Sequence, residues 1–291
     1  MKIFDCFPFF NELELLELRL ETYYNLVDRF VIVEADRTHA NIPKPYNFYD
    51  HLSDFKKFLP KIHYVMDGTN VPYKGANDWS IENHQRNSIA KGLTDAAPDD
   101  LIMISDVDEF PNPDMLKTLR ESFTDATKGL DVIAFYDTAP YTKGKVVRFH
   151  CGTRINEFLD LTPVVCQQEF HSYYFDWVCR ENIWTGTVIG KFKHMKSPQA
   201  FRNARLGLAR IVNGGWHFSS MGGIDKFLEK VRSAPDFSKY SDADKDFLIA
   251  AIKSGKYLIG GSKFVPRDVN EIALPTLKTF LKKYPQFLRG A

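Results

Sequence analysis

Residues 101–109, LIMISDVDE, join an apolar run directly to an acidic one. The first four side chains are all apolar, which is typical of a short strand that a parallel sheet buries on both faces. Asp106, Asp108 and Glu109 follow almost at once. Because ligands of open α/β sheets bind beyond the carboxyl ends of the strands, this stretch predicts both a central strand and the edge of the sheet where a site lies.

Toward the amino terminus, short apolar runs alternate with amphipathic segments. We expect strands over residues 2–7, 29–35 and 61–66 and helices over residues 13–27, 48–58 and 79–97. Asn11 can cap the first of these helices. The alternation predicts an α/β fold with a largely parallel sheet and crossover helices, so that Glu12, Glu34 and Asp106, which follow strands, should converge on one crevice.

Beyond residue 113 the pattern is less regular. The expected elements are a helix over residues 114–123, strands over 131–136, 145–149 and 173–177, a glycine-flanked segment at 214–218, and helices over 224–232, 242–253 and 274–283. No repeat, low-complexity tract or linker divides the chain. We therefore expect one α/β domain, residues 1–291, with a mixed sheet flanked by helices and a helical tail over residues 224–291.

The composition disfavours several classes of partner. Thirty-eight Lys and Arg against 37 Asp and Glu give a net charge of +1, too little to attract a nucleic acid or an anionic membrane. No apolar run approaches the roughly 18–20 residues that cross a bilayer, and we find no signal peptide or membrane anchor. We therefore expect a cytoplasmic protein with reduced cysteines; only export would allow a disulfide between Cys166 and Cys179.

The acidic residues at 106 and 108 form the strongest local signal. Two carboxylates one residue apart at a strand end can present oxygen ligands to a hard divalent cation, and that cation can bridge a diphosphate. The spacing alone is weak, because it recurs at Asp242, Asp244 and Asp246 within a charged helical segment. Those copies are an internal control and are expected to be inert. The apolar strand before Asp106 favours a metal site over a solvated turn.

Two other protein classes with related chemistry fit poorly. Haloacid-dehalogenase phosphatases carry Thr two residues beyond their second aspartate, where this chain has Phe110. Sugar-phosphate nucleotidyltransferases carry a glycine-rich phosphate loop after the first strand, where this chain has residues 8–11, PFFN. Both classes are therefore disfavoured.

Two further residues could contribute to a site. Arg86, with Asn87, lies on the helix before the acidic stretch, where a guanidinium could pair with a phosphate or sugar oxygen; the alternative is a surface arginine. His217 lies between glycines, and a neutral imidazole is a good ligand for Mn²⁺ beside two carboxylates; the alternative is a buried core histidine. The residues alone leave both choices open.

Five motifs occur in order along the chain. They are residues 5–12 (DCFPFFNE), 33–35 (VEA) with Thr38 and His39, 85–87 (QRN), 105–111 (SDVDEFP), and 214–219 (GGWHFS) with 221–223 (MGG). In this combination the chain resembles glycosyltransferase family 17, whose known members are β-1,4-N-acetylglucosaminyltransferases. The resemblance spans roughly residues 1–260.

This resemblance implies a GT-A fold, an inverting mechanism, a UDP-sugar donor and a divalent cation, Mn²⁺ or Mg²⁺. It implies that Asp106 and Asp108 bind the metal and the donor, with Glu109 in support and His217 as a further metal ligand. Residues 1–110 would form the nucleotide-sugar-binding half and residues 111–223 the acceptor half. The residues expected to bind the donor are Asn11, Glu12, Glu34, Arg86 and Asn87.

The acceptor half should supply the general base that takes the proton of the attacking hydroxyl. Glu169, Asp176 and Glu181 surround the expected aromatic strand, and Asp176 is the first choice because aromatic rings that could stack on a sugar flank it. The expected reaction is transfer of N-acetylglucosamine to a glycan hydroxyl. Two alternatives stay open: another donor, such as UDP-galactose or UDP-glucose, and a non-catalytic protein that binds a glycan or a nucleotide sugar.

Overall fold

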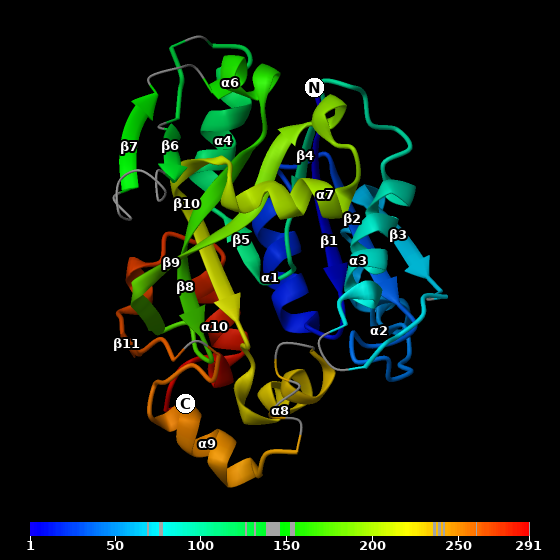
Figure 1. Ribbon diagram of the computed structural model, residues 1–291, viewed down its shortest axis with the longest axis vertical. Coiled ribbons are helices and arrows are strands. Elements are labelled where there is room, and N and C mark those ends of the chain that lie inside the picture. The colour runs from blue at the N-terminus through cyan, green and yellow to red at the C-terminus, as the bar shows by residue number, and fades with distance from the viewer. Residues whose placement is uncertain are drawn as a thin grey trace.

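The structure is a computed structural model. It describes residues 1–68, 70–75, 78–125, 127–130, 132–137, 146–151, 155–234, 237, 240, 242–259 and 261–290, with the backbone alone for 133–137 and 146–151. One mixed sheet runs through the molecule with helices on both faces (Figure 1). The predicted mixed α/β sheet flanked by helices is confirmed.

The sheet is parallel on one side and mixed on the other. Its strands are β1 Ile3–Phe9, β2 Arg29–Ala35, β3 Ile62–Asp67, β4 Leu101–Ile104, β5 Glu109–Pro111, β6 Val132–Asp137, β7 Val146–Cys151, β8 Val164–Ser172, β9 Trp177–Lys191, β10 Ala209–Ser219 and β11 Phe264–Pro266. Their order is β3-β2-β1-β4-β9-β8-β10-β6-β7, with β5 beside β10 and β11 beside β9. β3, β2, β1 and β4 pair in parallel, whereas β9 runs antiparallel to β4. The carboxyl ends of β1, β2 and β4 therefore share one edge.

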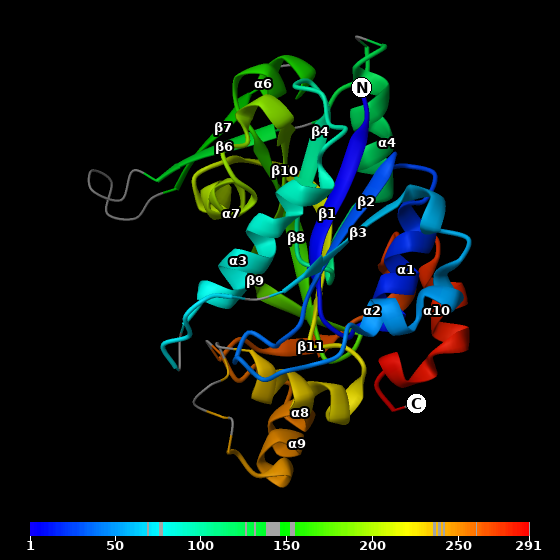
Figure 2. The same cartoon turned by 90° about the vertical axis from the view of Figure 1, so that its right-hand side faces the viewer.

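Helices cover both faces of this sheet. They are α1 Leu13–Tyr23, α2 Asn47–Asp50, α3 Ser80–Asn87, α4 Pro113–Ser122, α6 Ile155–Leu161, α7 Pro198–Asn203, α8 Gly223–Ser233, α9 Lys245–Lys253 and α10 Leu277–Lys283. Figure 2 shows α3 and α7 on one side of the strands and α1 and α10 on the other. Side chains of β1 alternate between the two layers: Phe7 and Phe9 join the core under α1 and α10, while Phe4 and Cys6 join the core under α7.

Several strand predictions are confirmed closely, and β2 and β4 have the predicted bounds. β1 runs on through Pro8, where we expected it to end. The Cys6 carbonyl accepts a hydrogen bond from the Ser105 amide, so the Pro8 nitrogen, two residues later, faces the same side of β1. Proline is tolerated there because β4 has already ended on that side and no partner needs an N–H donor. β6 and β7 lie where strands were expected, although Asp131 and Lys145 fall outside the described residues.

Three predictions of local structure are wrong. Of the strand expected over residues 173–177, only Trp177 lies in a strand, as the first residue of β9, and residues 173–176 form the turn after β8. Tyr173 in this turn has a φ of 70°, and its ring centroid lies 5.1 Å from that of Phe227 of α8. The helix expected over residues 79–97 is shorter in the structure: α3 ends at Asn87, and a 3₁₀ turn, Ser88–Gly92, follows it. The helix expected over 48–58 is shortened in the same way to α2 and a 3₁₀ turn, Leu52–Phe55.

The tail contains the predicted helices α8, α9 and α10, but it also contributes β11, which pairs with β9. In the described part of the chain, no helix is both long and apolar enough to cross a membrane. Cys6, Cys166 and Cys179 are buried free thiols, and the Cys151 side chain lies outside the described residues. The pairing of β11 with β9 joins the tail to the sheet by backbone hydrogen bonds.

Candidate active site

A cavity of about 770 Å³ opens at the carboxyl ends of β1, β2 and β4. One wall comes from the end of β1, the loop after β2, and α3. The other wall comes from β8, β9, β10 and the tail. Residues predicted for the site that line it are Glu12, Arg86, Asp106, Asp108 and His217. The carboxyl ends of the parallel strands therefore place Glu12 and Asp106 at one cavity, whereas Glu34 does not line it.

The acidic turn, residues 105–109, is held from beneath by Arg19 of α1. This arginine is fully buried and donates two hydrogen bonds to Asp5, at 2.6 and 2.8 Å. It also donates to the Ser105 hydroxyl and to the backbone carbonyls of residues 106, 107 and 109, at 2.5–3.2 Å. Arg19 thus fixes the backbone from which both aspartates project. A signal for it existed in the sequence, because Arg19 lies three and four residues from apolar members of the buried helix face.

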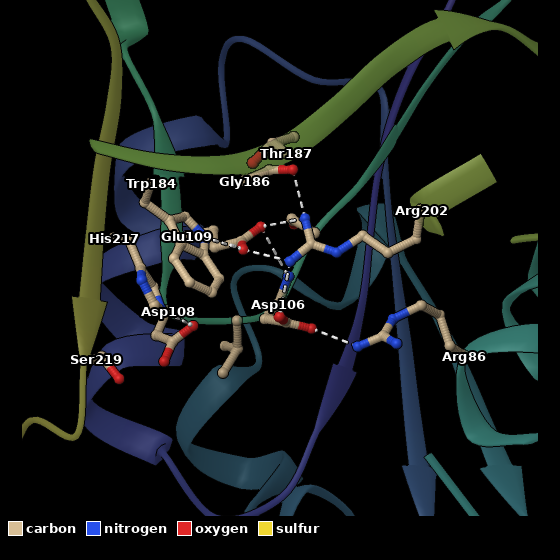
Figure 3. A network of polar contacts seen from close by, with 12 residues as sticks. Arg86, Asp106, Asp108, Glu109, Trp184, Gly186, Thr187, Arg202, His217 and Ser219 are labelled. Atoms are coloured by element: carbon tan, nitrogen blue, oxygen red, sulfur yellow. Dashed lines mark hydrogen bonds and ion pairs between the residues drawn. The ribbon is translucent and has the colours of Figure 1, made fainter. Parts of the chain in front are cut away.

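Asp106 is clamped between two arginines (Figure 3). Arg86 donates to its Oδ1 at 2.7 Å, and Arg202 of α7 donates to its Oδ2 at 2.9 Å. Burial alone would raise the pKa of Asp106, but the charges of Arg202 and Arg86 outweigh burial and hold that pKa far below its usual range. Both carboxylate oxygens therefore have cationic partners.

Glu109 supports this arrangement from within the protein. It is fully buried, and both of its carboxylate oxygens accept hydrogen bonds from Arg202. Its Oε1 also accepts from the indole Nε1 of Trp184 at 2.7 Å. The supporting role expected for Glu109 agrees with these contacts, whereas a direct ligand role does not, because Glu109 does not line the cavity.

Asp108 faces the other wall. Its Oδ1 lies 3.4 Å from His217 Nε2, and its Oδ2 lies 3.5 Å from Lys230 Nζ of α8. Burial would raise the pKa of Asp108, but His217 and Lys230 outweigh it and lower that pKa. The imidazole packs against the rings of Trp184 and Phe170, with centroids 4.3 and 5.3 Å away, and those two rings lie 5.9 Å from each other. These ring contacts restrict the imidazole in the orientation that presents Nε2 to Asp108.

Asp108 and His217 fit a divalent cation better than Asp106 does. Among the described residues, no group of three His, Cys, Asp or Glu side chains is arranged to hold an ion. However, Asp108 Oδ1 is buried without a hydrogen-bond partner, and its 3.4 Å separation from His217 Nε2 is near the roughly 3 Å between adjacent ligands of one octahedral ion. A carboxylate and an imidazole suit Mn²⁺. Asp106, with two arginine partners, fits this role less well.

His217→Ala should weaken Mn²⁺ binding about 10–100-fold, because the change removes a nitrogen ligand that two rings hold in place. The loss of affinity should exceed the loss of folding stability. Titration of free Mn²⁺ by electron paramagnetic resonance, with urea unfolding in parallel, measures both. His194→Ala is the control, since this histidine contacts backbone carbonyls away from the cavity. Unchanged Mn²⁺ affinity in His217→Ala would remove this histidine from the metal site.

Three residues expected to bind the donor lie outside the cavity lining. The Glu34 carboxylate is fully buried and accepts hydrogen bonds from Lys44, Tyr64 and the first amides of α2. Asn87 is exposed and accepts from the Gln199 backbone at the start of α7. Asn11 does not cap α1, because Glu12 is the cap residue. The polar groups of Glu34 and Asn87 thus contact other parts of the protein, and Asn11 lies just before α1, outside the lining.

The three carboxylates considered for the general base also lie outside the lining. Asp176 lies in the turn after β8 and accepts from the Arg289 backbone at 3.1 Å. Glu169 pairs with Arg267, and Glu181 is exposed. The choice of Asp176 depended on an aromatic strand that does not form. Tyr173 packs against Phe227 of α8, and Phe175 packs against Phe218 of β10 and Phe280 of α10.

Among the described residues, the carboxylates that line the cavity are Glu12, Glu82, Asp106 and Asp108. Glu82 and both aspartates form ion pairs, whereas Glu12 forms none with a described residue. The Glu12 Oε2 accepts from two backbone amides, at 3.1 and 3.3 Å. Burial, and then the negative charge of Asp108, raise the pKa of Glu12. A carboxylate with these properties can accept a proton.

Comparison with known proteins matches part of the chain. Residues 1–129 match the sequence model of glycosyltransferase family 17. Curated relatives named beta-1,4-mannosyl-glycoprotein 4-beta-N-acetylglucosaminyltransferase, from Homo sapiens and Rattus norvegicus, are each 28% identical over 116 residues, and that of Mus musculus is 27% identical. The matched segment covers 38% of this chain and 22% of each relative. The predicted resemblance is confirmed over this amino-terminal part.

Proposed function

From the family 17 match over residues 1–129, we propose that the protein is a glycosyltransferase that moves a sugar from a UDP-sugar to a glycan hydroxyl with inversion. The observation that supports this most directly is the acidic turn, which lies within the matched segment and opens into the cavity beside His217. The order β3-β2-β1-β4 followed by antiparallel β9 supports assignment to the GT-A type. N-acetylglucosamine is the first sugar to test, because the names of the relatives include it.

A divalent cation, Mn²⁺ or Mg²⁺, would be held by Asp108 and His217 and would neutralise charge on the donor diphosphate. Arg86 and Arg202 hold the Asp106 carboxylate in one orientation, within the same acidic turn as Asp108. The acceptor hydroxyl attacks the anomeric carbon as the bond from that carbon to the diphosphate breaks, and its proton passes to a carboxylate. Glu12 replaces Asp176 as our candidate base, because it lines the cavity, has no counter-ion among the described residues and has a raised pKa.

A screen of nucleotide sugars tests this function. UDP-N-acetylglucosamine, UDP-galactose and UDP-glucose should be compared for slow hydrolysis to UDP and for thermal stabilisation, each with Mn²⁺ and with EDTA. We expect one UDP-sugar to stabilise the protein and to release UDP only when the ion is present. UDP release that EDTA leaves unchanged would contradict the metal requirement.

A non-catalytic binding protein is the second candidate. The cavity of about 770 Å³ with stacked rings suits a bound sugar even without turnover. The same screen, repeated with a range of glycan acceptors, separates the two candidates. A binding protein would be stabilised by the UDP-sugar but would release no UDP in the presence of Mn²⁺ and these acceptors.

Asp244→Ala should leave turnover unchanged. Asp244 caps α9 by accepting a hydrogen bond from the Asp246 amide at 3.3 Å, and it does not line the cavity. Loss of the cap should cost about 1 kcal/mol of folding stability. Initial rates and urea unfolding check the two parts of this prediction. A hundredfold loss of turnover would mean that the functional acidic cluster is the one in the tail.

A further inference from the structure

The cationic residues that line the cavity differ in how fully they are paired. Within the described part of the chain they are Arg37, Lys44, Arg86, Arg205 and Lys230. Arg37 donates to Asn41 at 2.7 Å, and Lys44 donates to Glu34 at 2.7 Å. Arg86 donates to Asp106 and Glu82, at 2.7 and 2.8 Å. These three already have anionic or polar partners, so Arg86, which we expected to face a phosphate, has an internal role.

Arg205 lacks such a partner. Its side chain is half-buried in the wall beyond α7, and it makes no hydrogen bond or ion pair with a described residue. Its guanidinium carbon lies 5.7 Å from the centroid of the Trp184 ring. Burial and the like charge of Arg202 lower the pKa of Arg205. Partly burying an unpaired cation beside another cation is unfavourable unless an anion joins them.

Lys230 reaches the same cavity from α8. Its Nζ lies 3.5 Å from Asp108 Oδ2 and 3.4 Å from the Ser219 hydroxyl. If Asp108 binds a cation, its negative charge is shared with that cation. Lys230 is then left with an incompletely compensated positive charge at the cavity surface.

We propose that Arg205 and Lys230 bind the diphosphate of the donor nucleotide, Arg205 near Asp106 and Lys230 beside Asp108. This inference rests on the proposed function. The diphosphate of a UDP-sugar carries two negative charges and gains a third as it departs, so cations placed before the reaction stabilise the developing charge. Neighbouring carboxylates would otherwise repel this group. Two cations near the acidic turn therefore complete a site that the carboxylates alone disfavour.

The test compares a nucleoside with none, one or two phosphates, and adds a diphosphate that lacks the nucleoside. Uridine, UMP, UDP and inorganic pyrophosphate are titrated calorimetrically into the wild type, Arg205→Gln and Lys230→Gln, with Mn²⁺ and with EDTA. Each variant should bind UDP about 10–100-fold more weakly, as expected for the loss of one charge-assisted hydrogen bond, and pyrophosphate should follow. The affinity for uridine should stay unchanged. Arg205→Lys should retain part of the UDP affinity because it keeps the charge.

Arg232→Gln is the matched control, since this exposed arginine lies on α8 with Lys230 but does not line the cavity. It should bind every ligand like the wild type. If both cavity variants bind UDP within twofold of the wild type, the inference is wrong while the proposed function stands. An equal loss for uridine would also overturn it, because the whole pocket would then have changed. A wild type that binds no UDP would refute the proposed function itself.

Discussion

Asp108→Asn should abolish Mn²⁺-dependent UDP binding and lower turnover by at least about 10²–10³-fold. The substitution keeps the shape of the side chain but removes the charge that lies 3.4 Å from His217 and 3.5 Å from Lys230. Folding should be little affected, because Asp108 supports the turn mainly through its backbone carbonyl, which accepts from the Phe218 amide at 2.8 Å. Calorimetric titration of Mn²⁺ and UDP, with steady-state rates, measures the effect.

Asp106→Asn is the informative comparison. Removing that charge leaves the buried Arg86 and Arg202 without their shared anion, so this variant should lose folding stability as well as activity. The two variants should therefore differ in their effects. Asp108→Asn should impair ion binding at nearly native folding stability, whereas Asp106→Asn should also unfold more easily. Wild-type Mn²⁺ affinity in Asp108→Asn would rule out Asp108 as a ligand.

Arg19→Met should reduce the free energy of unfolding by about 3–5 kcal/mol. The change strands the fully buried Asp5 carboxylate and leaves the carbonyls of the acidic turn without their donor. An apolar side chain of similar length fills the space but supplies none of these hydrogen bonds. Urea unfolding monitored by circular dichroism gives the size of the loss.

The double variant Asp5→Leu with Arg19→Met distinguishes the contribution of Arg19 to folding stability from its role in positioning the acidic turn. Replacing both members of a buried ion pair by apolar residues often restores stability, so this variant should unfold near the wild-type urea concentration. The acidic turn would still lack the guanidinium that holds its carbonyls, and Mn²⁺ affinity should remain reduced. If both stability and Mn²⁺ affinity recover, Arg19 contributes only to packing.

The parallel half of the sheet could be predicted because its signals are local. β4 is a continuous apolar run and β2 contains one, residues 30–33, so the bounds of both strands follow from the sequence alone. The end of α3 depends on a contact across the fold: a Cβ on Gly92 would lie 2.4 Å from Val31 Cγ1, so the 3₁₀ turn there packs closely on β2. Such contacts between distant residues leave no periodic pattern.

Some residues of the candidate site could likewise be predicted from the sequence, and others could not. Glu12, Asp106 and Asp108 line one cavity because parallel strands end at one edge of a sheet, which is a general property of the topology. The same rule predicts that Glu34 lines the cavity, yet its carboxylate accepts hydrogen bonds from the amides at the start of α2. Arg202 and Lys230 could not be identified in advance, since each meets its carboxylate partner only after segments far apart in the chain have folded together.

The two walls of the cavity come from different parts of the chain. Glu12, Arg86, Asp106 and Asp108 lie within residues 1–129, which match the family 17 model, whereas Trp184, His217 and Lys230 lie beyond them. β4 nevertheless pairs with β9, the strand that carries Trp184 of the opposite wall. The backbone that leads into the acidic turn is therefore tied by hydrogen bonds to the wall it faces, so a change that shifts β9 is transmitted to Asp106 and Asp108 without touching either side chain.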